Sequence, residues 1–202
     1  MDDDTRYADF LFEAGTMRKL LRMHRQTLLT DDMSDNIATH SYRVTLIGWI
    51  LAKKEKVDPY KVVMMCLLHD MGEVRSNDHN WIHKRYVKVH DEEIINEQLG
   101  TLPDPELAEI AHEYDVRESA EAIIAKDADL LDQVLLLREY EWQGNKEATI
   151  WLRGKQGNEH QGQSAQLAKL RLESSKKLGA TMLERAPSDW WNELWTSSNR
   201  TS

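Results

Sequence analysis

Three segments of the sequence carry imidazole and carboxylate side chains next to apolar runs. They are NIATHSYRVTL around His40, MMCLLHDMGE around His69 and Asp70, and AKDADLLDQV around Asp127, Asp129 and Asp132. Imidazole nitrogen and carboxylate oxygen together make a ligand set that suits a divalent transition metal. An ion of this kind lowers the pKa of a bound water molecule and polarises a phosphoryl oxygen. If the three segments meet, they predict a centre for metal-assisted hydrolysis.

The apolar periodicity places His40 on the buried face of a helix. His40 lies three residues after Ile37 and four residues before Val44, which is helical spacing. For a lone inward histidine, a hydrogen bond to a neighbouring core group is the simpler interpretation. His69 and Asp70 change that balance, because they end the most apolar helix of the chain. An imidazole and a carboxylate are costly to bury unless they are paired or coordinated.

The third segment does not single out one carboxylate. Asp129 follows Ala125 by four residues and precedes Leu136 by seven, so it lies on a partly apolar face. For Asp127 and Asp132, simple exposure to solvent is an alternative interpretation. Periodicity alone leaves both Asp129 and Asp132 as candidates for the fourth ligand.

Helices are the elements expected to position these residues, because strand-like alternation is almost absent and the chain has only 9 Gly and 4 Pro. Asp58 before Pro59 and Ser119 before an apolar run are typical helix starts. The helix that contains VVMMCLL is apolar all round and is expected to be central and buried. The expected helices cover residues 8–25, 34–54, 59–72, 80–89, 91–100, 119–143 and 145–153. Another helix is capped by Asp104 and Pro105, a long one is capped by Ser164, and a final turn begins at residue 187. The prediction is an all-α protein with one domain over residues 8–196 and flexible tails at 1–7 and 197–202.

Composition excludes several classes of function. The chain has 202 residues, 41% hydrophobic and 30% charged, with a formal net charge of −9. A net charge of this sign argues against binding a nucleic-acid polymer through many phosphates. Neither a signal peptide nor an apolar run near the ~20 residues of a membrane span is present. One cysteine fits a reducing compartment, so we expect a cytoplasmic protein without membrane contact.

The order His, then His-Asp, then Asp resembles the signature of HD-domain metal-dependent phosphohydrolases. The segments SDNIATHSYRV, DPYKVVMMCLLHDMGEVRSND and AKDADLLDQVLLLREY are similar to the small single-domain branch that includes the 5′-deoxynucleotidases. This resemblance implies a helical bundle, usually a homodimer, that holds one divalent ion. It also implies that the ligands are His40, His69, Asp70 and Asp129.

The resemblance implies further roles, residue by residue. Glu73 matches the acid that orients or deprotonates the attacking water, and Asp78 matches an acid near the leaving 5′-oxygen. Arg25 matches an arginine near the phosphate, and Lys84 matches a lysine of the following segment. Gln26 departs from the pattern, because an aromatic residue often occupies that position and packs against the sugar. Without the resemblance, a helix cap is an equally good interpretation of Asp78. Arg25 and Lys84 are then equally well interpreted as surface cations.

The function expected from these residues is hydrolysis of nucleoside 5′-monophosphates, deoxy or ribo, by a metal-bound water. One alternative keeps the metal but acts on a nucleoside triphosphate or another small phosphate ester. The other is a non-catalytic nucleotide-binding module, against which the pair Glu73 and Asp78 argues, because a binder needs neither acid. The ligand set does not distinguish Co, Mn, Ni, Fe and Zn.

Overall fold

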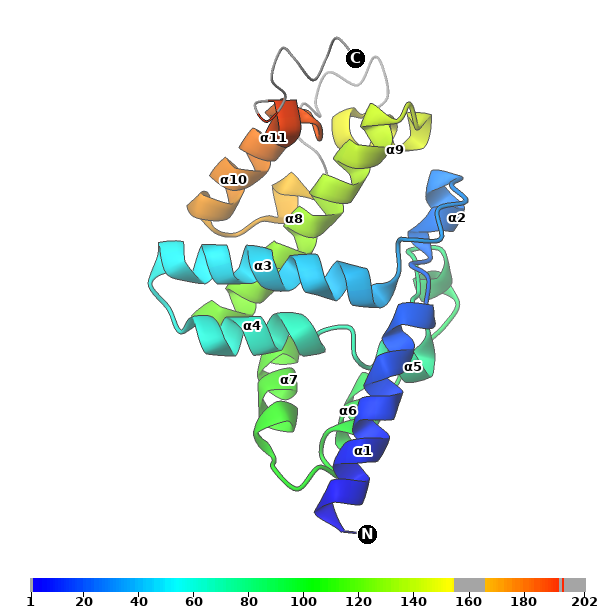
Figure 1. Cartoon of the computed structure of the whole chain (residues 1–202), viewed down its shortest axis with the longest axis vertical. Coiled ribbons are helices and arrows are strands. Elements are labelled where there is room, and N and C mark those ends of the chain that lie inside the picture. The colour runs from blue at the N-terminus through cyan, green and yellow to red at the C-terminus, as the bar shows by residue number, and fades with distance from the viewer. Residues whose placement is uncertain (1, 155–165, 193, 195–202) are drawn as a thin grey trace.

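The computed structural model describes residues 2–154, 166–192 and 194, and these residues form helices joined by short turns (Figure 1). No helix among the described residues is long and apolar enough to cross a membrane. An isolated antiparallel bridge joins Leu21 to Asn36. The predicted all-α fold is confirmed.

Helices α3 (Ile37–Glu55) and α4 (Pro59–Leu68) form the first half of the core. Asn36 caps α3 by accepting a hydrogen bond from the Thr39 amide at 3.0 Å, and Pro59 occupies the first turn of α4. The two helices approach closely at Gly48, where an added Cβ would lie 2.6 Å from Cys66 Sγ. This approach brings the end of α4, with His69 next to it, against α3.

Helix α8 (Ala120–Trp142) crosses behind α3 and α4 and is the longest helix described (Figure 1). Ser119 caps it, as predicted, by accepting a hydrogen bond from the Ala122 amide at 3.2 Å. Helices α7 (Glu106–Val116), α9 (Lys146–Arg153) and α10 (Glu173–Glu184) pack on α8. The apolar side of α8 therefore lies at the centre of the fold.

The N-terminal region differs from the prediction of one helix over residues 8–25. Helix α1 (Asp3–Ala14) begins within the segment expected to be a tail, because the Asp2 side chain caps it. A 3₁₀ turn (Gly15–Lys19), the bridge at Leu21 and the short α2 (His24–Leu28) follow. The bridge to Asn36 interrupts the helix and turns the chain toward α3.

Three other expectations differ in detail. Helix α4 ends at Leu68 rather than at Gly72, and Leu67 is 41% exposed, so α4 is not buried all round. Residues 80–89 form only the 3₁₀ turn His83–Arg85, since Asn80 Oδ1 accepts the amides of Ile82 and His83. The predicted cap Ser164 lies outside the described residues, and α10 begins at Glu173. The remaining short helices are α5 (Glu73–Ser76), α6 (Asp91–Gln98), Leu167–Lys169 and α11 (Asp189–Asn192).

Candidate metal centre

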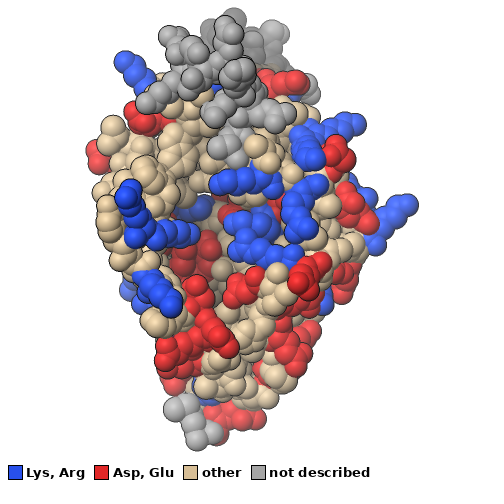
Figure 2. Space-filling model, turned by 180° about the vertical axis from the view of Figure 1, so that it is seen from behind, with Lys and Arg blue, Asp and Glu red and all other residues tan. Residues whose placement is uncertain are grey.

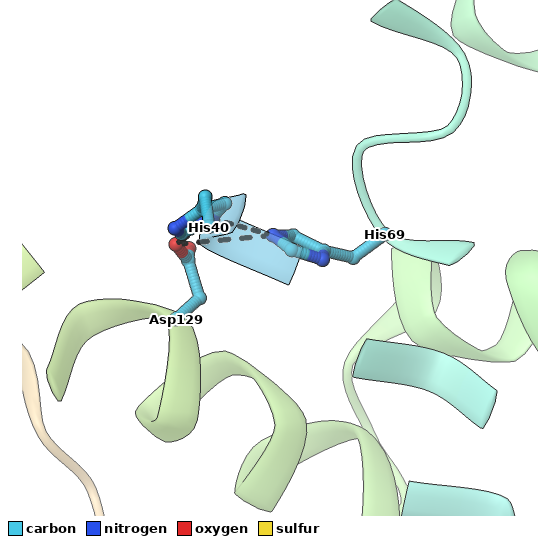
Figure 3. A group of neighbouring side chains, drawn as sticks. All are labelled: His40, His69 and Asp129. Carbon is cyan, nitrogen blue, oxygen red and sulfur yellow. Dashed lines mark hydrogen bonds and ion pairs between the residues drawn. The ribbon is translucent and has the colours of Figure 1, made fainter. Parts of the chain in front are cut away.

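Side chains from three helices converge at one point of the bundle. Ligand atoms of His40, His69 and Asp129 lie within 4.8 Å of one another (Figure 3). The two Nε2 atoms are 3.1 Å apart, and Asp129 Oδ1 lies 3.4 Å from His40 Nε2. Asp70 Oδ2 adjoins them, 3.4 Å from His40 Nε2 and 3.2 Å from His69 Nε2. The structure thus brings together all four predicted ligands.

These separations fit a common ion. Bonds from zinc to imidazole nitrogen or carboxylate oxygen are about 2.0–2.2 Å long, so neighbouring ligand atoms around one ion lie about 3.0–3.5 Å apart. Four of the five separations recorded in this group lie between 3.1 and 3.4 Å, and the fifth, from His69 Nε2 to Asp129 Oδ1, is 3.9 Å. The donor set therefore fits a divalent transition metal in both chemistry and spacing.

The remaining ring nitrogens are held from behind. His40 Nδ1 lies 2.6 Å from Asp132 Oδ2, and His69 Nδ1 lies 2.8 Å from the carbonyl oxygen of Cys66. A carboxylate or carbonyl oxygen accepts a hydrogen bond from Nδ1–H and leaves Nε2 free as a ligand. This is the usual arrangement for metal-binding histidines. Asp132 is itself held by Arg43 and by Arg22, whose Nη1 is 3.5 Å away.

The electrostatics of the cluster match a site that must balance a cation. Burial and the nearby Arg22 oppose charge on His40, but Asp129, Asp132 and Asp70 together raise the pKa of His40 to about 10. Burial opposes the charge of Asp129 as well, yet Lys126, His40 and His69 hold the pKa of Asp129 well below its ordinary value. The proton on His40 thus supplies positive charge that a bound ion would supply instead.

Glu73 and Asp78 lie on the same cavity as the ligands, which has a volume of about 980 Å³. Burial raises the pKa of Glu73 to about 9, with further contributions from Asp70 and Asp78. Its Oε2 atom is buried and has no hydrogen-bond partner among the described residues. Asp78 is buried and accepts a hydrogen bond from the Met23 amide. Glu73 is therefore a carboxyl group with a free oxygen beside the ligands.

The predicted substrate-binding residues are placed differently from one another. Lys84 is exposed and lines the cavity. Arg25 points away from it, with Nη1 3.3 Å from Met33 Sδ and Nη2 3.8 Å from the exposed Asp31. Gln26 is exposed, and its Oε1 accepts a hydrogen bond from Asn80 Nδ2 at 2.9 Å. Arg25 thus contacts groups outside the cavity lining. Gln26 contacts Asn80, which belongs to the lining.

Arg22 and His24 line the cavity and were missed by the sequence reasoning. Arg22 is 7% exposed and lies against His40 and Asp132. His24 is 8% exposed, and its Nε2 atom has no hydrogen-bond partner among the described residues. Burial and the nearby Arg22 lower the pKa of His24 to about 3. Arg22 lies in the irregular segment before α2, and His24 is the first residue of this short helix, so helical periodicity gives neither side chain an orientation. Arg25 follows Arg22 by three positions, so only the path of the chain distinguishes them.

The two aspartates for which solvation was an alternative are buried, with exposed fractions of 1% for Asp127 and 2% for Asp132. The carboxylate of Asp127 accepts the backbone amides of Arg171 and Leu172 at 3.0–3.2 Å. A buried carboxylate is tolerated when such donors satisfy it. Asp127 therefore anchors the segment after α9, whereas Asp132 supports His40.

A helical bundle with a mixed histidine and aspartate cluster at its centre matches a known class. A model of the HD domain matches residues 17–171, and the chain belongs to this family. The 5′-deoxynucleotidase HDDC2 of Dictyostelium discoideum is 30% identical over 125 residues, which is 55% of this chain and 66% of that protein. The human 5′-deoxynucleotidase HDDC2 is 28% identical over 141 residues, or 65% of this chain and 67% of that protein. The chain thus spans about two thirds of the length of these relatives.

Solved structures agree on the fold. A conserved hypothetical protein from Pyrococcus furiosus matches with a TM-score of 0.69 and 26% identity, over 88% of this chain and 97% of that one. A predicted metal-dependent phosphohydrolase from Magnetospirillum magnetotacticum matches with a TM-score of 0.64 and 21% identity, over 90% and 91%. At this identity, the second likeness shows the fold alone.

Proposed function

We propose that this protein is a metal-dependent phosphohydrolase that removes phosphate from nucleoside 5′-monophosphates. The observation that carries the proposal is the cluster of His40, His69, Asp70 and Asp129 beside a cavity whose lining includes His69, Asp70, Asp129 and Glu73. The relatives named 5′-deoxynucleotidase support the substrate class. A divalent ion held by the four ligands supplies Lewis-acid activation of water and of a phosphoryl oxygen.

The chain's own residues divide the remaining work. Glu73 takes the proton of the attacking water, because its carboxyl has a buried oxygen without a partner among the described residues and lines the same cavity as Asp70 and Asp129. Arg22 and Lys84 balance the phosphate charge from the cavity wall. Arg22 takes the part that the resemblance implied for Arg25, since its guanidinium lies beside the ligands. Asp78 lines the same cavity, which supports the part that the resemblance implied for it, an acid near the leaving oxygen.

The sugar and base are proposed to lie toward the outer part of the cavity. Trp81 lines it and is 64% exposed, so its ring is available for stacking on a base. The neutral His24 offers an unpaired ring nitrogen to a sugar hydroxyl. The side-chain oxygen of Gln26 accepts a hydrogen bond from Asn80. Gln26 therefore contributes to the distinction between ribose and deoxyribose only indirectly, by fixing the position of Asn80.

A homodimer and a cytoplasmic location remain predictions. The exposed side of α3 carries Tyr42, Leu46 and Trp49, which are 67%, 49% and 51% exposed and follow helical spacing. An apolar stripe of this kind supports the proposal of a subunit contact, because single surface hydrophobics are common but aligned ones mark interfaces.

The test is a phosphate-release screen of the chelator-treated protein. Ribo- and deoxynucleoside mono-, di- and triphosphates are assayed with Mg, Mn, Co, Ni and Zn added singly. We expect release from the 5′-monophosphates with a transition metal, and loss of release in Glu73→Gln at unchanged metal content. Release from triphosphates alone would favour the alternative substrate class. Tight nucleotide binding without release under any metal would favour a binding module.

A further inference from the structure

Three basic side chains gather on the cavity wall away from the metal ligands. Arg117 ends α7, while Lys169 and Arg171 belong to the segment that precedes α10. Arg171 Nη1 donates a hydrogen bond to the carbonyl oxygen of Arg117 at 3.3 Å, so the two residues are neighbours. Asp127 fixes the backbone at Arg171 through its amide. The cationic cluster of Arg117, Lys169 and Arg171 is therefore built from two segments that are held together.

Arg117 interacts with the carboxylate of Asp115 on the same cavity, but among the described residues this cluster makes none of the close ion pairs that other basic residues of the cavity make. Arg22 pairs with Asp132, and Lys126 pairs with Asp129. Within the described part of the chain, the cluster makes no close ion pair with a carboxylate; Arg117 instead lies over the ring of Tyr114. Like charges held together on a concave wall attract an anion. This positive charge is notable in a chain with a net charge of −9.

The face shown in Figure 2 has Lys and Arg side chains around a hollow with acidic side chains inside and below it. The cavity lining has the same composition, since it includes the carboxylates of Asp70 and Asp129 as well as the three residues of the cationic cluster. Figure 2 therefore agrees with a cavity that presents a second positive region besides the metal centre.

Tyr114 connects the cluster to the metal centre. Its ring packs edge to face on His69, with 5.8 Å between centroids, and the guanidinium carbon of Arg117 lies 5.0 Å from the same ring. The centroid of the His69 ring and the guanidinium carbon of Arg117 are therefore at most about 11 Å apart, because they lie 5.8 Å and 5.0 Å from the centroid of the same Tyr114 ring. One small molecule is long enough to reach both sites.

We propose that Arg117, Lys169 and Arg171 form a second anion subsite, which binds a phosphate carried by the leaving group of the substrate. This inference rests on the proposed phosphohydrolase function and narrows its substrate class to nucleoside 5′-phosphates with a second phosphate on the sugar. In the step itself, the water oxygen bonds to the 5′-phosphorus and the bond from phosphorus to the 5′-oxygen breaks. The alcohol leaves with a proton, and the second phosphate stays on it.

The test compares three substrates that differ in the place of the second phosphate. They are adenosine 5′-monophosphate, adenosine 3′,5′-bisphosphate and its isomer adenosine 5′-diphosphate. We expect the bisphosphate to have a KM at least tenfold below that of the monophosphate, with a smaller gain for the diphosphate. In Lys169→Gln/Arg171→Gln, the KM for the bisphosphate should rise about tenfold, while the KM for the monophosphate changes less than twofold.

The control is Lys53→Gln/Lys54→Gln, which removes the same charge from the exposed end of α3 and should change neither constant. Equal KM values for monophosphate and bisphosphate, or an equal loss for both in the Lys169/Arg171 variant, would overturn the subsite. Equilibrium binding of the bisphosphate to Glu73→Gln separates this outcome from failure of the proposed function. Cluster-dependent binding without turnover of any phosphomonoester would sustain the subsite and reject the phosphohydrolase.

Discussion

Asp132 Oδ2 lies 2.6 Å from Nδ1 of His40, while Nε2 of the same ring faces His69. The carboxylate accepts a hydrogen bond from Nδ1–H and so favours the tautomer that presents Nε2 as a ligand. Asp132 is thus a positioning residue that acts through His40. It lies one helical turn from Asp129, which faces the centre directly.

Replacing Asp132 should weaken metal binding without abolishing it. In Asp132→Asn, the amide can still contact the ring but no longer stabilises the Nδ1–H tautomer, so we expect metal affinity to fall about 10–100-fold. Competition with a chromogenic chelator measures the change. An unchanged metal affinity would show that the Asp132 carboxylate serves to pair with Arg22 and Arg43 and not to orient His40.

Removing a ligand should have a larger effect than removing its support. His69→Ala and Asp129→Ala should lose nearly all bound metal after dialysis, as measured by elemental analysis. Asp91→Ala is the matched control, because Asp91 lines the same cavity and is exposed. Full occupancy in the two ligand variants would reject the assignment of the centre.

Glu73→Gln should separate chemistry from binding. The amide keeps the volume of the side chain but cannot accept the water proton, and a positioned base contributes about 10²–10⁴-fold in rate. We expect kcat to fall by that factor while metal content and KM stay close to those of the wild type. Wild-type turnover would mean that Glu73 has a structural part.

The stability of the metal-free protein should fall as pH rises. The pKa of His40 is raised to about 10 from 6.5 and that of Glu73 to about 9 from 4.5, so the folded state holds protons that the unfolded chain releases. The stabilisation is present below the unfolded values and is lost as pH rises through 9 to 10. Each retained proton contributes a slope of about 1.4 kcal/mol per pH unit.

Urea unfolding of chelator-treated protein between pH 6.5 and 9.5 measures this slope. Saturating metal should flatten it, because the ion replaces the protons at the cluster. His40→Gln is the informative variant, since it removes one of the two titrating groups. A free energy of unfolding that is independent of pH in the metal-free wild type would contradict the coupling.

Packing of α3 on α4 predicts a matched pair of glycine variants. Gly48→Ala places a Cβ 2.6 Å from Cys66 Sγ, so we expect a loss of about 1–3 kcal/mol. Gly15→Ala meets nothing within 4 Å at a φ of −60° and should be neutral or stabilise by about 0.4–1 kcal/mol. Adding Cys66→Ala to Gly48→Ala should recover part of the loss. Equal unfolding midpoints for the two single variants would contradict the close approach.

Local signals in the sequence determined most helices and the identity of the metal-binding segments. The caps at Asn36 and Ser119 and the proline at 59 work through bonds or φ restraints within a few residues, so they can be recognised without the fold. The spacing of His40 on its apolar stripe predicted its burial for the same reason. The departures occur where non-local contacts act, as in the bridge between Leu21 and Asn36 that interrupts the predicted N-terminal helix.

Tertiary structure decided the roles of residues that are near neighbours in sequence. Asp129 and Asp132 are three residues apart on α8, so both can face the same region. Their positions relative to the two ring nitrogens of His40 make one the candidate ligand and the other its proposed support. Arg22, rather than Arg25, reaches the cavity because the bridge at Leu21 sets its direction. The cationic cluster of Arg117, Lys169 and Arg171 joins residues more than fifty positions apart. Such groupings depend on chain path and burial, which no local pattern of the sequence encodes.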